Sequence, residues 1–148
     1  VYGSDWILGD YMSIRLDHIG IACENLEMAS QFWRILGLIQ GEDDHLVEDQ
    51  GVTVRFFKTN DSQKSPRIEL LEPTSEDTPI GKFLQKRGPG IQQMCFEVDD
   101  IESTIARLVE SDIVMIDEVP KRGAEGSLIA FVHPRSTGGV LVELTQKE

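Results

Sequence analysis

The sequence predicts an α+β protein in which two tandem β-α-β-β-β modules form one curved, eight-stranded mixed sheet. The first observation behind this prediction is an internal repeat. Residues 16–26 match residues 91–101, and residues 67–71 match residues 141–145. The second observation is that the same order of strand and helix patterns follows each copy. Two segment pairs with one shared spacing indicate an internal duplication.

The repeat places chemically similar residues in register. His18 falls on Gln93, an offset of 75 residues, and Glu69 falls on Glu143, an offset of 74 residues. Imidazole, carboxamide and carboxylate groups are metal-ligand types. A duplicated module that supplies two polar residues per copy can therefore build one four-ligand site between the copies.

The length of 148 residues predicts one domain. We expect residues 15–148 to form it, with module one at 15–72, a linker at 73–90 and module two at 91–146. Residues 1–14 are interpreted as an extension or a tag remnant, because they contain neither the basic region nor the long apolar stretch of a secretory signal.

Module one begins with a predicted strand at residues 15–23. Asn25 is a suitable N-cap for the helix that follows, and Gly37 is a suitable residue to end it. Polar turns then separate three further predicted strands, at residues 38–48, 52–59 and 67–72.

Module two repeats this order. A strand at 92–98 precedes a helix that Asp100 caps and that has an apolar stripe from Ile101 to Val109. Further strands are predicted at residues 113–119, 127–133 and 139–145. In the linker, Pro79 is a good first residue for a short helix.

Strand alternation assigns the special residues to one face of the sheet. Apolar neighbours on both sides of Glu69 and of Glu143 predict that these neighbours face a helix layer. Gln93 and His18 have the same parity. We therefore expect helices on the convex face of the sheet and all four polar side chains in a cleft on the other face.

Composition excludes several classes of partner. The chain has 14 basic and 26 acidic side chains, so its net charge is −12. Such a field repels nucleic acid and anionic membrane surfaces, and we expect neither as a partner. Cys23 and Cys95 are too few for a disulfide framework and lack the spacing of a zinc site. They indicate reduced thiols in a cytoplasmic protein.

Several segments resemble a known family. The LDHIGIA opening, the IELLEP strand and the GGVLVELTQ ending are similar to the vicinal-oxygen-chelate superfamily, which includes glyoxalase I, extradiol dioxygenases and bleomycin-resistance proteins. Within it, the stretches TSEDTPIGKFLQKRGPGIQQMCFEVDDIE and FVHPRSTGGVLVELTQ resemble the methylmalonyl-CoA epimerases. The resemblance covers residues 15–146.

The resemblance implies a divalent metal held by His18, Glu69, Gln93 and Glu143. The chain departs from the epimerases at Gln93, where they carry a histidine. A glutamine oxygen favours hard cations such as Mg²⁺, Mn²⁺ or Co²⁺ over softer ones such as Ni²⁺ or Zn²⁺. The identity of the metal stays open among these five.

The resemblance also implies a reaction and the groups that perform it. An epimerase would interconvert (2R)- and (2S)-methylmalonyl-CoA, or a similar acyl-CoA, through an enolate. Glu143 is the expected acid/base and Glu69 its expected counterpart, with Glu48 as a second candidate. Lys121 and Arg122 are candidates for binding the coenzyme A phosphates. We expect a homodimer.

Two other functions remain as alternatives. One is glyoxalase I (lactoylglutathione lyase), which uses similar metal and carboxylate chemistry and tolerates a glutamine ligand. The other is a metal-free protein that binds and sequesters a small molecule, such as a drug. A metal assay combined with turnover tests on both substrates would separate the three functions.

Overall fold

The computed structural model describes residues 13–123 and 126–148. Module one contains β1 (Ile14–Ala22), α2 (Leu26–Leu36), β2 (Ile39–Gln40), β3 (His45–Val47), a 3-10 turn (Glu48–Gln50), β4 (Val52–Lys58) and β5 (Arg67–Pro73). Helix α3 (Pro79–Arg87) joins the modules. Module two contains β6 (Gly90–Val98), α4 (Ile101–Glu110), β7 (Lys121–Arg122), β8 (Leu128–Val132), a 3-10 turn (Pro134–Ser136) and β9 (Leu141–Gln146). Residues 1–12 of the expected extension lie outside the described part.

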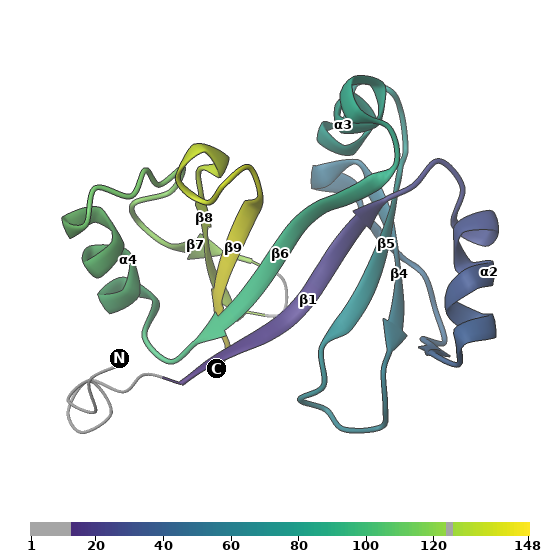
Figure 1. The fold of residues 1–148 in the computed structure, drawn as a ribbon, viewed down its shortest axis with the longest axis horizontal. Coiled ribbons are helices and arrows are strands. Elements are labelled where there is room, and N and C mark those ends of the chain that lie inside the picture. Colours follow the sequence, from purple (N-terminus) through teal and green to yellow (C-terminus); the bar gives the residue numbers. More distant parts are fainter. Residues whose placement is uncertain (1–12, 124–125) are drawn as a thin grey trace.

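These strands form one mixed sheet, and the predicted α+β class is confirmed. The strand order is β2-β4-β5-β1-β6-β9-β8-β7, with β3 paired to β4. β1 and β6 are antiparallel to each other and cross the middle of the molecule (Figure 1). Each also runs parallel to the last strand of its own module, β5 or β9. The central four strands therefore repeat about an approximate twofold relationship.

Helix boundaries follow the predicted caps. The side chain of Asn25 accepts a hydrogen bond from the backbone N–H of Met28, and Asp100 does the same for Ser103. Gly37 ends α2 with a φ of 113°, a left-handed conformation that favours glycine. In the linker, Thr78 caps α3 and Pro79 is its first residue. The local sequence thus sets where each helix begins.

Helices α2 and α4 cover the same face of the sheet. α2 packs on Phe57 and Leu70, and α4 packs on Val98 and Leu144. Leu71 and other residues of opposite parity instead contact α3, which lies at one end of the other face. We call this other face the inner face. Glu69 and Glu143 share its parity, as alternation predicts.

Two expected strands differ in the structure. The strand predicted at 38–48 is divided into β2 and β3, because Asp44 in the intervening acidic turn is drawn to Arg55 at 2.9 Å. The strand predicted at 113–119 forms only an isolated bridge at Met115. There the side chain of Asp117 accepts the hydrogen bond of Phe131 N–H, which a strand would have used.

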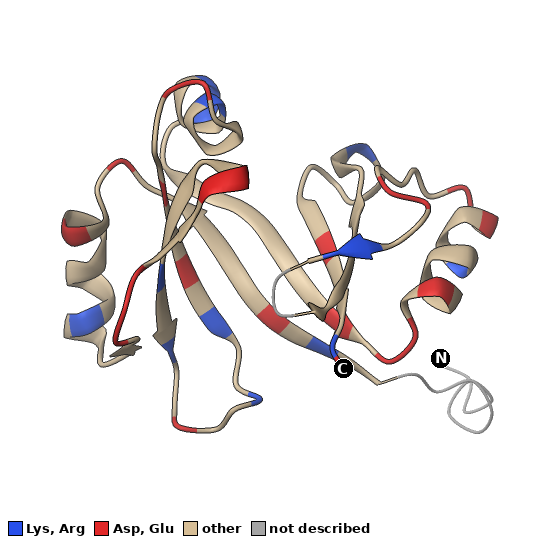
Figure 2. Cartoon of the chain, turned by 180° about the vertical axis from the view of Figure 1, so that it is seen from behind, with Lys and Arg blue, Asp and Glu red and all other residues tan. Residues whose placement is uncertain are grey.

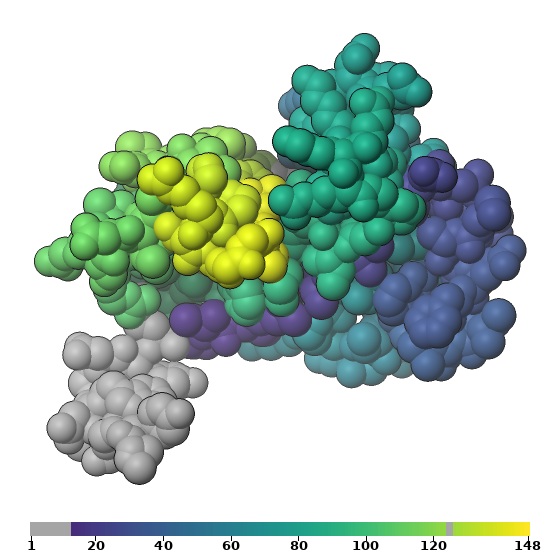
Figure 3. All heavy atoms as spheres, turned by 45° about the horizontal axis from the view of Figure 1, so that its top comes forward, coloured from purple at the N-terminus to yellow at the C-terminus, as the bar shows by residue number. Residues whose placement is uncertain are grey.

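Helix α2 also has an apolar outer surface. Met28, Phe32, Ile35 and Leu36 are all exposed, and Ile35 retains 86% of its accessible area. The helix lies at one end of the molecule, with this surface turned away from the second module (Figure 3). Trp33 packs into the core as the predicted stripe requires, whereas Phe32 and Leu36 do not.

Candidate metal and acid/base site

The four residues singled out by the internal repeat come together around His18. They project from four neighbouring strands: Glu69 from β5, His18 from β1, Gln93 from β6 and Glu143 from β9. Glu69 Oε2 lies 3.3 Å from His18 Nδ1. Gln93 Nε2 lies 3.4 Å from His18 Nε2, and Glu143 Oε1 lies 3.9 Å from the same atom.

Gly20 makes room for this cluster. It is the cross-strand partner of Gln93 and the parallel partner of Glu69. A Cβ at this position would lie 2.9 Å from Gln93 Cγ and 3.1 Å from Leu71 Cδ1. A larger residue would therefore push Gln93 away from His18.

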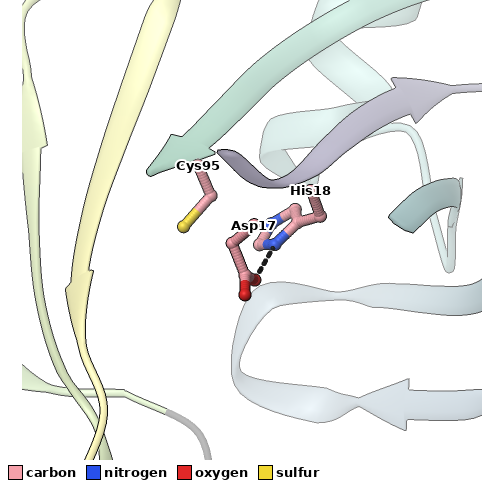
Figure 4. A group of neighbouring side chains, drawn as sticks. All are labelled: Asp17, His18 and Cys95. Carbon is pink, nitrogen blue, oxygen red and sulfur yellow. Dashed lines mark hydrogen bonds and ion pairs between the residues drawn. The ribbon is translucent and has the colours of Figure 1, made fainter. Parts of the chain in front are cut away.

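Asp17 is a buried member of the cluster that the sequence did not reveal. The pairing of β1 with β6 shifts between Leu16 and His18, so Asp17 has no opposite residue and forms a bulge. Its carboxylate reaches the same side as His18 and accepts a hydrogen bond from Nδ1 at 2.8 Å (Figure 4). This contact fixes the imidazole with Nε2 directed to Gln93 and Glu143.

Cys95 is also close to the cluster. Its sulfur, the Asp17 carboxylate and a His18 ring nitrogen all lie within 4.8 Å of one another. The side chain is almost fully buried, and this burial, together with Glu143, raises the pKa of the thiol well above its usual range. A thiol held in its neutral form is a poor nucleophile.

The carboxylates of the cluster have unequal environments. Burial raises the pKa of Asp17, but hydrogen bonds from His18 and Lys147 outweigh it and lower that pKa well below its usual range. Burial raises the pKa of Glu143 to about 7. Burial likewise raises the pKa of Glu69, against the opposing charges of His18 and Arg67. Glu69 and Glu143 thus lack sufficient positive charge.

The donor set fits a divalent cation. One imidazole nitrogen, one carboxamide oxygen and two carboxylates are ligands that Mg²⁺, Mn²⁺ and Co²⁺ accept. A cation among them would neutralise the two buried glutamates, whose charged forms are otherwise disfavoured. Asp17 behind His18 is the kind of partner that orients a ligand histidine.

Other predicted residues lie farther from His18. Lys121 sits 5.3 Å from the centre of the Phe131 ring, and Phe131 is the cross-strand partner of Glu143. Arg122 is exposed and contacts Glu148 at 3.7 Å. Glu48 is exposed in the 3-10 turn before β4, outside the cluster.

Known proteins of similar sequence identify the family. Residues 17–131 match the model of the glyoxalase/bleomycin resistance protein/dioxygenase superfamily. The chain belongs to this superfamily. It is 40% identical to human mitochondrial methylmalonyl-CoA epimerase over 99% of the chain and 78% of the relative. It is also 40% identical to the ethylmalonyl-CoA/methylmalonyl-CoA epimerase of Cereibacter sphaeroides, over 89% of the chain and 97% of the relative.

A solved structure agrees with these relatives. A variant of Streptomyces coelicolor methylmalonyl-CoA epimerase in complex with 2-nitronate-propionyl-CoA superposes with a TM-score of 0.78 at 36% identity. The match covers 90% of this chain and 96% of that one. These relatives make the chain an enzyme of the racemase and epimerase class. No helix in the described residues has the length and apolar character needed to cross a membrane.

Proposed function

We propose that the enzyme interconverts (2R)- and (2S)-methylmalonyl-CoA, or a closely similar acyl-CoA, and that it depends on a divalent metal. The two epimerases of similar sequence support the substrate. The acyl-CoA analogue held by the Streptomyces coelicolor relative supports a coenzyme A thioester.

The arrangement of two carboxylates carries this proposal. Epimerisation at C2 requires one group to remove a proton and another to return a proton to the opposite face. Glu69 and Glu143 come from β5 and β9, the strands that flank the central pair from opposite sides. They approach opposite nitrogens of the His18 ring. A substrate carbon held between them would have a carboxylate on each side.

The remaining residues would bind and orient. His18, Glu69, Gln93 and Glu143 would hold the metal, which when bound stabilises the negative charge that develops on the thioester oxygen. Asp17 holds His18 in one orientation. Lys121, over the Phe131 ring beside Glu143, would meet a coenzyme A phosphate together with Arg122.

Proton exchange in deuterated water tests the proposal. We expect the protein supplied with Mn²⁺ or Co²⁺ to introduce deuterium at C2 of methylmalonyl-CoA while it interconverts the two epimers. Replacing Glu143 or Glu69 by Gln removes an acid/base group, so epimerisation should fall by about 10²- to 10⁴-fold. Circular dichroism of each variant checks that the fold is retained.

Three results would contradict the proposal. The first is turnover of methylglyoxal with glutathione in place of methylmalonyl-CoA, which indicates glyoxalase I. The second is tight ligand binding without metal or turnover, which indicates a sequestering protein. The third is full epimerisation by the Glu143→Gln variant, which removes Glu143 from the mechanism.

We further propose that the enzyme is a cytoplasmic homodimer. The exposed apolar surface of α2, formed by Met28, Phe32, Ile35 and Leu36, supports association with a second copy. Cys23 and Cys95 are both buried and unpaired, which suits a reducing compartment.

A further inference from the structure

A small charged cavity adjoins the ligand cluster. Its volume is about 140 Å³, and its lining includes three cations, Lys58, Arg67 and Lys147. The carboxylate of Asp17 and polar residues of the 62–65 segment complete the lining. Three of the chain's 14 basic side chains thus gather in one cavity of a protein whose net charge is −12.

Both modules build this cavity. Lys58 and Arg67 are direct cross-strand partners at the open end of the β4–β5 hairpin. Lys147 follows β9 at the end of module two. Basic and acidic segments lie close together on the central strands (Figure 2). The cavity therefore lies at the junction between the two halves of the sheet.

The cavity has more positive charge than its own carboxylate can neutralise. Asp17 is already hydrogen-bonded to His18 at 2.8 Å and to Arg15 at 2.9 Å. Lys147 at 2.5 Å and Arg67 at 3.4 Å share the same carboxylate. Within the described residues, Lys58 has no ion-pair partner. An anion in the cavity would supply the missing negative charge.

Arg67 connects the cavity to the ligand cluster. Its Nη2 lies 3.3 Å from Glu69 Oε2 and 3.4 Å from Asp17 Oδ2. The guanidinium rests on the Phe56 ring, 4.9 Å from its centre, which restrains its orientation. About a third of the side chain remains exposed, so it can accept a further partner. An anion bound here would be one side chain away from the acid/base groups.

We infer that this cavity binds the carboxylate on C2 of the substrate and thereby selects 2-carboxyacyl thioesters. This inference rests on the proposed epimerase function. The planar fork of Arg67 matches a carboxylate in two hydrogen bonds, and Lys58 and Lys147 add positive charge. Coenzyme A phosphates are the other anionic source. They are separated from the thioester by the whole pantetheine arm, whereas the cavity directly adjoins the cluster.

Replacing Arg67 by Gln tests this inference through binding. The ligands are methylmalonyl-CoA and methylmalonyl-pantetheine, which lacks the nucleotide phosphates, and calorimetry measures both affinities in the presence of Mn²⁺. Losing one charge-assisted contact should weaken both ligands equally, by about 10- to 100-fold. The Mn²⁺ affinity itself should change by less than about threefold, since Arg67 is not among the ligand residues. Lys64→Gln, a change in the same loop but outside the cavity lining, should leave both affinities unchanged.

Each contrary result has a distinct meaning. A loss seen with methylmalonyl-CoA but not with methylmalonyl-pantetheine would make the cavity a phosphate site and overturn the inference. An equal loss of Mn²⁺ affinity would reduce Arg67 to a support for Glu69, and unchanged ligand affinity would remove it altogether. If the unaltered protein bound neither thioester and exchanged no proton, the proposed function would fail and the inference with it. Recovery of binding by Arg67→Lys would further support the charge requirement.

Discussion

Asp17 and His18 are neighbours in sequence, yet their side chains meet on one side of β1, with Asp17 Oδ2 2.8 Å from His18 Nδ1. In a regular strand, consecutive side chains point to opposite faces. The bulge between Leu16 and His18 removes this restriction. The ligand histidine thereby gains a buried carboxylate partner, and Arg15 and Lys147 neutralise that partner from the other side.

Replacing Asp17 by Asn should weaken metal binding while the ligand set stays complete. The amide cannot support the His18 Nδ1–H as a carboxylate does, and changes of this kind typically reduce metal affinity about 10- to 100-fold. Competition with a chromophoric chelator would measure the affinity for Co²⁺ or Mn²⁺. Asp44→Asn, which removes a carboxylate that pairs with Arg55 at the surface, is the matched control. Equal affinities in the two variants would count against a positioning role for Asp17.

Alternation in the sequence was sufficient to predict which side chains share the inner face. Glu69 and Glu143 each lie between apolar residues that contact a helix, so their direction followed from local pattern alone. Their approach to His18 followed from the repeat, because equivalent positions in paired modules occupy equivalent strands. The roles of these residues as ligands and acid/base groups stay predictions.

The same alternation could not reveal Asp17. It places Asp17 on the helix face, opposite to His18, and a bulge depends on the pairing partner, which a single strand does not specify. Asp117 presents a similar problem, since its side chain replaces a backbone partner that the strand pattern assumes. Side-chain competition for backbone hydrogen bonds is decided by tertiary contacts. Both missed features therefore arise from interactions between segments.

Replacing Gly20 by Ala should destabilise the protein and disturb the ligand cluster together. The added methyl would lie 2.9 Å from Gln93 Cγ, and overpacking of this kind typically costs about 1–3 kcal/mol. Denaturant unfolding measures the stability, and chelator competition measures the metal affinity. Gly41→Ala is the control, because its nearest neighbours, both atoms of Phe56, are 3.5 Å away. That variant should stay within about 0.5 kcal/mol of the parent. Unchanged stability and metal affinity in Gly20→Ala would show that the strand adjusts.

Replacing Gln93 by His should shift the metal preference towards nitrogen-preferring ions. Gln93 faces His18 Nε2 at 3.4 Å, so an imidazole there would present a second nitrogen to the same cation. The affinity for Zn²⁺ or Ni²⁺ should rise relative to that for Mn²⁺ or Mg²⁺, since imidazole suits the former and oxygen ligands suit the latter. Parallel competition titrations would measure this ratio. Gln92→His, one residue away on the opposite face of β6, is the control. An identical ratio in both variants would argue that Gln93 does not contact the metal.

Replacing Ile35 by Glu tests whether the apolar surface of α2 binds a second copy. Ile35 is 86% exposed, so in an isolated chain a charged residue there should change the free energy of unfolding by less than about 0.5 kcal/mol. At the centre of a dimer interface, the same change buries an unpaired charge and should weaken association about 100-fold or more. Sedimentation velocity across a concentration series would distinguish these results. Val119→Glu places the same charge on a residue that is 78% exposed at the other end of the molecule, and it should leave association unchanged. If both variants dissociated to the same degree, or neither did, α2 would not be the contact surface.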